Sequence, residues 1–486
     1  MNKKKNNDIN NNKPFETVFV TDSNGKTKPV EVVEEKKVSD KEIAINSAPT
    51  LDEIKGSLNK ELALENIKSK CKFKQDLVDN NVILSVNHLK QYFVFGKGPS
   101  KIKIKAVHDV NFKIKSGECF GLVGESGCGK TTTGRSIIRL YDITSGSIYY
   151  KGYRIGAGAR WNEKEIKYTN IRYHAALKAL EADKKTILSM FNAHTDIDKI
   201  HEKFSGYPLF NNVEEANNFF AKKKAENKEY RDNVIKVQKA KISQIRYDET
   251  HVDKKLMSEI QMIFQDPIDS LDPRMTVEDI IKEGLTITHT AGSKEEAHNK
   301  VCEALEKVGL IADYANRYPH EFSGGQRQRI GIARALVMNP RFLICDEPIS
   351  ALDVSIRAQI INLLNQLKEE MNLTIMFIAH DLSVVKYFCD RIAVMYFGEL
   401  VEVATSDELF KHPLHPYTKS LLSAIPKPNP LTEKDRVRIV YDPRKEHDYS
   451  VERPRMVEIV PGHFILANTS EIEKYKKEIA LLDSKK

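Results

Sequence analysis

A glycine-rich loop between an apolar segment and a helix-forming segment constrains the fold of this chain more than any other feature. The loop runs from Gly124 to Thr131 and reads Gly-Glu-Ser-Gly-Cys-Gly-Lys-Thr, the spacing G-x-x-x-x-G-K-[ST]. The apolar run Cys119–Val123 precedes it, and the sequence after it predicts a helix from Lys130 towards Leu140. A strand, such a loop and a helix in direct succession predict a phosphate-binding site in an α/β fold.

The residue types of this loop suit nucleotide phosphates. Glycines let main-chain N–H groups converge on phosphate oxygens without Cβ clashes, and the helix N-terminus adds a partial positive charge. Lys130 would place its charge against the β- and γ-phosphates, and the hydroxyl of Thr131 would ligate Mg²⁺. The weaker alternative is a structural turn that binds no phosphate. The predicted binding residues are Gly124, Glu125, Ser126, Gly127, Cys128, Gly129, Lys130, Thr131 and Thr132.

Composition excludes several classes of protein. Of the 486 residues, 41% are hydrophobic and 30% are charged, which is enough apolar surface for a large core. We find no apolar run near the roughly 18–20 residues that a membrane-spanning helix needs. The formal charge of +8 is mild for this length. The 6 cysteines include no C-x-x-C pair, which argues against a disulfide framework and favours a reducing compartment.

The chain divides into regions of different character. Residues 1–80 are polar and Asn-rich, which predicts a low-complexity, disordered tail. Residues 81–426 alternate strands with helices, which predicts a largely parallel sheet covered by helices. Residues 152–253 interrupt this pattern as a charged, helix-prone insertion, and residues 427–486 form a C-terminal extension. A tolerated surface insertion is the favoured interpretation of 152–253, and a partner-facing or regulatory element is the alternative.

A second apolar strand ends in two acids. Phe342–Cys345 is followed by Asp346 and Glu347, and strands of this kind present their last residues at the ligand-binding edge of an α/β sheet. Asp346 would hold Mg²⁺, and Glu347 would orient or activate the attacking water. Alone, the pattern is equally typical of a strand end capped by solvated acids. Behind a phosphate-binding loop it predicts a catalytic site.

A further Gly-rich turn makes the pattern specific. It opens a helix after Phe322, again an anion-binding arrangement, with Ser323, Gly324, Gly325 and Gln326. This segment is similar to the signature motif of ATP-binding cassette (ABC) ATPases, which more often have Leu at the position of Phe322. Cassettes also carry a glutamine before the helical region, an acid after the carboxylate strand and a histidine after the next strand. This sequence has all of them in order, as Gln265, Asp353 and His380.

The resemblance implies a fold and a set of roles. It implies an α/β, ABC-type P-loop ATPase, with a RecA-like core, an antiparallel β subdomain and an α-helical subdomain. The implied cofactors are ATP and Mg²⁺. Glu347, His380, Gln265 and Lys130 would be catalytic, and Thr131, Gln265 and Asp346 would hold the metal.

Cassettes of this family dimerise head to tail around two ATP molecules. Ser323 and Gly325 would reach the nucleotide of the opposing chain, and Asp353 would lie at the dimer seam. The aromatic that stacks on adenine is expected to be Tyr92, with Phe93 as the alternative.

Finer resemblance points to the F-type ATPase subunit of bacterial oligopeptide importers. The segments that carry it are Arg317–Glu321, Glu347–Gln359, His412–Pro426 and Val460–His463, and Gln326 favours the F type over the D type. The implied partners are a D-type ATPase subunit as a heterodimer, two transmembrane permease subunits and, indirectly, an extracellular peptide-binding protein. The implied location is the cytoplasmic face of the bacterial membrane.

Two alternatives to import of oligopeptides remain open. The same motor could serve dipeptides or metal chelates. A cassette acting on ribosomes or nucleic acid is disfavoured by the single P-loop and single signature, and only the Lys-rich insertion speaks for it. No nucleic-acid partner is therefore expected. No cysteine follows Cys389, so no iron–sulfur cluster is expected in the extension. Lys130 and the helix N-terminus could lower the pKa of Cys128, which suggested oxidative inhibition as a minor hypothesis.

Overall fold

The structure is a computed structural model that describes residues 17–21, 27–31, 71–96, 102–266, 270–350, 352–425 and 437–484. The chain divides between Trp161 and Asn162, and again between Ala240 and Lys241, into two compact units. Residues 162–240 belong to one unit, and both larger sheets belong to the other. Most of the expected tail at residues 1–80 lies outside the described residues. Its described part includes the antiparallel hairpin β1 (Thr17–Thr21) and β2 (Thr27–Glu31) and the helix α3 (Gln75–Asp79).

The larger unit is built around an 8-stranded sheet with the order β13-β14-β12-β11-β5-β10-β9-β8. The run from β11 to β8 is parallel throughout, and β12, β14 and β13 continue the sheet in antiparallel pairing. The parallel strands are β5 (Cys119–Val123), β8 (Ile260–Ile263), β9 (Phe342–Asp346), β10 (Thr374–Ala379) and β11 (Arg391–Tyr396).

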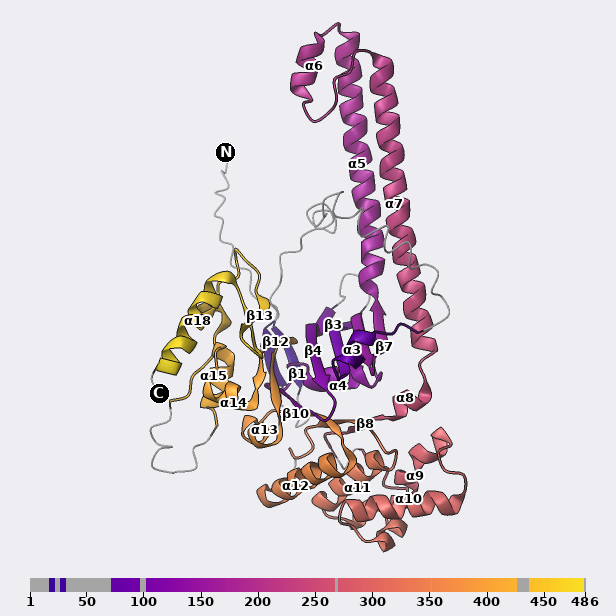
Figure 1. The fold of residues 1–486 in the computed structure, drawn as a ribbon, viewed down its shortest axis with the longest axis vertical. Coiled ribbons are helices and arrows are strands. Elements are labelled where there is room, and N and C mark those ends of the chain that lie inside the picture. Colours follow the sequence, from indigo (N-terminus) through magenta and orange to yellow (C-terminus); the bar gives the residue numbers. More distant parts are fainter. Residues whose placement is uncertain are drawn as a thin grey trace, which may run out of the picture. The chain divides into compact units, whose positions relative to one another are not determined.

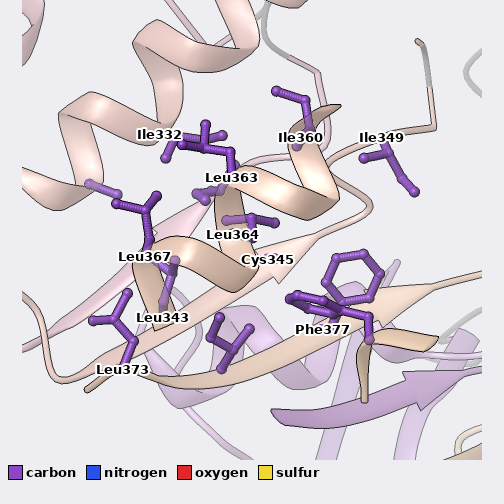
Figure 2. Close-up of a cluster of buried hydrophobic side chains, with 14 of the residues drawn as sticks. Ile332, Leu343, Cys345, Ile349, Ile360, Leu363, Leu364, Leu367, Leu373 and Phe377 are labelled. Carbon is purple, nitrogen blue, oxygen red and sulfur yellow. The ribbon is translucent and has the colours of Figure 1, made fainter. Parts of the chain in front are cut away.

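The central strands are apolar because both faces of the sheet are covered, one by helices and the other by residues 130–137 and the antiparallel sheet. Every residue of β5, β9 and β10 is buried, the pattern expected of parallel strands rather than of half-exposed ones. The helix α12 (Val354–Met371) covers one face with Ile360, Leu363, Leu364 and Leu367, which recur at the helical spacing of three, four and seven residues. Figure 2 shows these side chains directed towards Leu343 of β9 and Phe377 of β10.

A 4-stranded antiparallel sheet forms the second layer, with the order β4-β3-β6-β7. Its strands are β3 (Val82–Phe95), β4 (Ile102–Lys115), β6 (Ser145–Tyr150) and β7 (Tyr153–Ala159). β7 lies inside the range 152–253 that the sequence assigned to the insertion, yet it pairs with β6 along its length. The helical part of the insertion therefore begins at Arg160, because Tyr153–Ala159 pair with β6 and belong to the sheet.

The remaining helices of this unit complete the cassette pattern. A helical region lies between β8 and β9, and further helices connect the later strands. These helices and the two sheets confirm the predicted α/β class, with a parallel core, an antiparallel β part and an α-helical part. These elements are α4 (Lys130–Ile137), α8 (Lys254–Ser258), α9 (Val277–Thr288), α10 (Lys294–Lys307), the 3-10 helices Ala312–Asn316 and Pro319–Glu321, α11 (Gly324–Leu336) and α13 (Leu382–Phe388).

The insertion forms a helical hairpin, drawn as the two long neighbouring helices in Figure 1. It consists of α5 (Arg160–Asn192), α6 (Ile197–Lys203) and α7 (Val213–Thr250). Later residues of α5 contact earlier residues of α7. Asn162 Nδ2 donates to Gln238 Oε1 at 2.7 Å, and Glu181 pairs with Lys224 at 3.3 Å. The helices are therefore antiparallel. Their connecting end is closed by a small apolar cluster of Ile187, Ile200, Phe210, Ala216 and Phe220.

The last turns of α7 are fastened to the antiparallel sheet within the larger unit. The guanidinium of Arg154 on β7 pairs with the carboxylate of Asp248, and both side chains are buried. Asp248 also accepts hydrogen bonds from Gln244 Nε2 at 2.6 Å and from the main-chain N–H of Lys72 at 3.3 Å. Removing one partner of such a pair would leave a buried, uncompensated charge. The pair therefore holds the last turns of α7 against β7.

The C-terminal region extends the main sheet and packs a helix against it. Its elements are β12 (Glu399–Thr405), α14 (Ser406–Lys411), α15 (Pro416–Ser423), α17 (Pro443–Glu446), β13 (Arg455–Val460), β14 (His463–Ala467) and α18 (Thr469–Ser484). A cluster of Leu414, Ile465, Ala467, Tyr475 and Ile479 joins α18 to the last strand. None of the described helices is both long and apolar enough to cross a membrane.

A buried acid holds this region together. Glu402 of β12 accepts hydrogen bonds from the main-chain N–H groups of Leu414 at 2.8 Å and of His415 at 3.1 Å. His463 of β14 places Nε2 at 2.8 Å from Glu402, and both side chains are fully buried. Burial acts to lower the pKa of His463, but Glu402 and the nearby Glu408 outweigh it and raise the pKa above its usual value. A protonated His463 therefore stabilises the folded chain.

This raised pKa predicts a pH-dependent stability. The contribution of His463 is fully present below the pKa of an unfolded histidine, about 6.5, and is lost as the pH rises through the raised folded value. Glu402 and Glu408 face the ring, and Glu408 also bonds His412. Between about pH 6 and pH 9, the midpoint of thermal unfolding should therefore fall more for the natural chain than for His463→Gln. The same substitution at exposed His201 is the control and should keep the natural slope. Equal slopes for the natural chain and His463→Gln would contradict the prediction.

Candidate nucleotide site

The site lies where parallel strands end together. Val123 of β5 is opposite Ala379 of β10, and Ile378 of β10 is opposite Asp346 of β9. Ile263 of β8 is opposite Cys345. The residues that follow these strand ends are therefore brought to one edge of the sheet, the place where open α/β sheets bind ligands. From the sequence predictions, this edge gathers Lys130, Thr131, Gln265, Asp346, Glu347 and His380.

Two glycines of the P-loop (residues 124–131) allow the close approach of other strands. At Gly124, with φ of +153°, a Cβ atom would lie 2.2 Å from the carbonyl oxygen of Met395 at the end of β11. At Gly129, with φ of +108°, it would lie 2.3 Å from the carbonyl oxygen of Ala106 on β4. The loop is therefore wedged between both sheets, and only glycine fits at these two positions.

The side chain of Lys130 points back into the P-loop. Its ammonium group is buried, and it donates to the carbonyl oxygens of Gly124 and Glu125, at 2.8 Å each. It also lies 3.9 Å from Glu347 Oε1. Because the ammonium group is held by the loop's own carbonyls, its positive charge stays at the centre of the curve that a phosphate would occupy.

Thr131 and Asp346 form a second contact at this edge. The hydroxyl of Thr131 donates to Asp346 Oδ1 at 2.8 Å. Among the residues that the structure describes, the other oxygen, Oδ2, is buried without a hydrogen-bond partner. Burial raises the pKa of Asp346 to about 6, although the Thr131 hydroxyl acts in the opposite direction. A hydroxyl and an unsatisfied carboxylate oxygen side by side are suitable ligands for a hard divalent cation.

Glu347 is held in an unusual conformation by its neighbours. Its φ is +46°, in the left-handed region that a residue with a Cβ adopts at a cost. Oε2 receives His380 Nδ1 at 3.0 Å and the amide Nε2 of Gln265 at 3.2 Å. Burial acts to raise the pKa of Glu347, but His380 and Lys130 outweigh it and hold the pKa below its usual value. The hydrogen bond that His380 donates to the Glu347 carboxylate conversely raises the pKa of His380. The carboxylate is therefore ionised and directed at this edge.

The structure does not bring the signature residues to this group. Ser323 caps α11 by accepting from the main-chain N–H of Gln326 at 3.4 Å, and Gln326 Oε1 accepts in return from Ser323 N at 3.0 Å. Asp353 stands at the N-terminus of α12. Within the described ranges, no hydrogen bond or ion pair joins these residues to the P-loop. Any nucleotide contact of Ser323, Gly324, Gly325, Gln326 and Asp353 stays a prediction.

The aromatic candidates for adenine both lie on β3. Tyr92 bonds His108 through its hydroxyl, and their rings stack at 5.7 Å. The ammonium group of Lys103 lies 4.1 Å from the centre of the Tyr92 ring. Phe93 instead meets Tyr141 edge to face at 5.2 Å. Both rings have neighbours, so the choice of Tyr92 over Phe93 also stays a prediction.

The minor hypothesis that the pKa of the Cys128 thiol is lowered is contradicted, whereas the favoured interpretation, a small residue that fits the loop, stands. Cys128 is buried, and burial raises the pKa of its thiol although Lys130 acts to lower it. The motif placed a positive charge beside the sulfur, but only the folded structure shows how completely the sulfur is removed from water. A protonated, buried thiol is a poor nucleophile, so the physical basis of the oxidation hypothesis is removed.

Two residues of the site were not predicted from the sequence. Arg357 donates to the carbonyl oxygens of Leu352 at 2.7 Å and of Ser350 at 3.5 Å, and so holds the loop that follows Glu347. Tyr417, far along the chain, accepts a hydrogen bond from the main-chain N–H of Glu125 at 3.0 Å. Both lie in segments noticed only for their family resemblance, and neither segment carries a local signal of contact with the site.

Two family models match the chain. The model of the ABC transporter family matches residues 107–244 and 224–350. The model of the oligopeptide/dipeptide transporter C-terminal region matches residues 401–449. The first match spans the P-loop and the Asp346–Glu347 strand end, and the second contains Glu402 and Tyr417.

Curated relatives align over most of their own lengths. The oligopeptide transport ATP-binding protein OppF of Bacillus subtilis (strain 168) is 44% identical over 393 residues, covering 81% of this chain and 98% of the relative. OppF of Streptococcus pyogenes serotype M1 is 44% identical over 385 residues, covering 79% and 95%. The dipeptide transport ATP-binding protein DppF of Lactococcus lactis subsp. cremoris (strain MG1363) is 43% identical over 389 residues, covering 80% and 95%.

The wedged P-loop predicts a position-specific effect of adding a methyl group. Gly129→Ala should lower the free energy of unfolding by roughly 2–6 kcal/mol, the sum of backbone strain and a clash with Ala106. Gly331→Ala is the control, because no atom lies within 4 Å of its added Cβ, and it should change stability by no more than about 1 kcal/mol. Urea unfolding of the full chain measures both. Similar stabilities of the two variants would show that the loop is not wedged.

Proposed function

The chain belongs to the ABC transporter family and to its oligopeptide-transport ATP-binding proteins, and we propose that it powers peptide import through separate membrane subunits. It is an ATPase of the cassette type. The observation that carries the proposal is the Glu347 carboxylate, bonded by His380 and Gln265 beside the P-loop lysine. The match to transporter relatives continues through the C-terminal region, which supports a transport rather than a ribosomal role.

Hydrolysis needs a water aligned with the γ-phosphate. We assign Glu347 to orient that water and accept its proton, because the carboxylate is ionised and already fixed on two sides. His380 would hold Glu347 and meet the γ-phosphate with its second ring nitrogen. Lys130 would neutralise charge on the β- and γ-phosphates from the centre of the loop.

The residues present fit a bound Mg²⁺. The Thr131 hydroxyl and Asp346 Oδ2 would be ligands, and the unsatisfied state of that buried oxygen supports the assignment. Gln265 would contribute its amide oxygen, since its amide nitrogen bonds Glu347. The metal would supply charge neutralisation for the phosphates. The proposed ligands leave the remaining positions to phosphate oxygens and water, as is usual for Mg²⁺.

ATP would stabilise a dimer of two cassettes by binding residues of both chains. The N-terminus of α11, with Ser323 and Gly325, is an anion-binding arrangement, and within the described ranges no hydrogen bond or ion pair joins it to the P-loop of its own chain. We therefore assign it to the γ-phosphate bound by an opposing cassette, a D-type subunit. Asp353 would lie at the seam, and Tyr92 would stack on adenine. Hydrolysis would remove the contacts that hold the closed dimer.

The remaining parts of the transporter are other proteins. We propose two transmembrane permease subunits, a location on the cytoplasmic face of the bacterial membrane and indirect service of an extracellular peptide-binding protein. Gln265 and Arg317–Glu321 would transmit closure to the permeases. Oligopeptides are the proposed cargo, and the DppF relative makes dipeptides the alternative.

Removing the carboxylate should separate binding from turnover. Glu347→Gln should bind ATP within a few-fold of the natural affinity and lose roughly 10²–10⁴ of its hydrolysis rate, because an amide cannot accept the proton of water. Glu369→Gln, an exposed acid on α12, is the matched control and should keep natural activity. Phosphate release by the transporter complex measures the rate. Near-natural hydrolysis by Glu347→Gln would remove Glu347 from the proposed role.

Trapping tests the proposed partners. The Glu347→Gln chain, tagged and incubated with ATP and Mg²⁺ in its native cells, should hold the closed dimer and co-purify with a second cassette ATPase and two membrane permeases. Natural chain treated with ADP is the control and should recover less of the second cassette. Recovery of ribosomes or nucleic acid without membrane subunits would overturn the transport proposal, and a permease dedicated to dipeptides would correct the cargo.

A further inference from the structure

We propose that Tyr417, in the C-terminal region, is a positioning residue of the nucleotide site. Its hydroxyl oxygen accepts the main-chain hydrogen bond of Glu125 and thereby fixes the first half of the P-loop. The inference rests on the proposed ATPase site and extends it to a segment outside the motifs that bind nucleotide. Tyr417 does not act on ATP itself, but through the shape of the loop that does.

The peptide groups around Glu125 are held from two directions. Its N–H donates to Tyr417 Oη at 3.0 Å, and its carbonyl oxygen accepts Lys130 Nζ at 2.8 Å. The same carbonyl oxygen accepts the N–H of Cys128 at 3.3 Å. Because the Lys130 bond also places the charge for phosphate, a rotation of these peptide groups would disturb the cation and the loop together. Tyr417 holds the N–H of Glu125 from outside the loop.

Tyr417 is itself immobilised. It lies in the first turn of α15, is 1% exposed, and donates its main-chain N–H to Nδ1 of His415 at 3.1 Å. Its ring packs against Tyr396 at 4.5 Å and Tyr441 at 5.5 Å. Burial raises the pKa of Tyr417 well above its usual value, so the hydroxyl stays neutral at any working pH. The packed ring therefore holds the hydroxyl oxygen at the position where it accepts from Glu125.

The support continues to the end of the sheet. Glu402 accepts the N–H groups of Leu414 and His415, which set the start of α15, and His463 of the last strand holds Glu402 from the other side. A continuous series of contacts thus leads from β14 through Glu402 and α15 to the P-loop. The C-terminal extension contributes to the nucleotide site through this series, without supplying a group that touches nucleotide.

The test compares two tyrosines that differ in one contact. Tyr417→Phe keeps the packed ring and removes the acceptor for Glu125, whereas Tyr441→Phe makes the same chemical change in the neighbouring ring. The loop binds phosphate in the ground state and in the transition state, so loss of its support should raise KM and leave kcat nearly unchanged. For one hydrogen bond, we expect KM for ATP with Mg²⁺ to rise about 2- to 12-fold in Tyr417→Phe and to stay natural in Tyr441→Phe.

A second measurement does not depend on turnover. Amide hydrogen exchange of the full-length chain should be faster at Glu125 in Tyr417→Phe than in the natural chain, and unchanged there in Tyr441→Phe. The unfolding midpoint of Tyr417→Phe should lie only slightly below that of Tyr441→Phe, because both rings stay packed and only Tyr417 loses the hydrogen bond to Glu125.

Each outcome bears on the proposal. Natural KM and natural exchange at Glu125 in Tyr417→Phe would overturn it. Lower kcat and a lower unfolding midpoint with natural KM would also overturn it, because Tyr417 would then serve stability alone. Absence of ATP hydrolysis by the natural complex would instead contradict the proposed function, and exchange at Glu125 would still decide the contact.

Discussion

Parallel pairing of β5 with β10 and β11 positions every other part of the nucleotide site. It places the loop after β5 between the ends of its neighbours, and β9 and β8 follow in the same direction. The ends of β5, β10, β9 and β8, from distant parts of the sequence, thereby meet at one edge. The helices and the antiparallel sheet serve this arrangement, because buried parallel strands need apolar cover on both faces.

The chemistry of this edge depends on burial and charge acting against each other. Asp346 is buried deeply enough that its pKa rises to about 6, while Glu347, the next residue, is held ionised by His380 and Lys130. Adjacent acids thus acquire different properties from their surroundings. At Cys128, as at Asp346, burial dominates: it outweighs the positive charge of Lys130 and raises the pKa of the thiol. Neighbours in sequence suggest such interactions, but burial decides which one dominates.

Buried acids also fasten the additions to the cassette. Asp248 pairs with Arg154 where the helical insertion returns to the antiparallel sheet, and Glu402 pairs with His463 where the extension joins the main sheet. In each case one carboxylate also accepts main-chain N–H groups from a third segment. An addition fastened in this way can vary beyond its attachment without moving the strands that form the site, because the attachment is specific and its loss would be costly.

The motifs and their local shapes follow from the residues of each segment alone. Gly124 to Thr131 predicts its own strand, loop and helix because glycine, lysine and threonine at that spacing constrain the backbone locally. The apolar run before Asp346 likewise predicts a buried strand that ends in acids. The meeting of Asp346 with Thr131, and of Glu347 with His380 and Gln265, could be anticipated because ends of parallel strands share an edge. Only the tertiary structure decided the register of those strands, the left-handed conformation of Glu347, the incorporation of residues 153–159 into the sheet and the contact between Tyr417 and Glu125. Each of these depends on segments far apart in the chain, and no local pattern encodes which of them will touch.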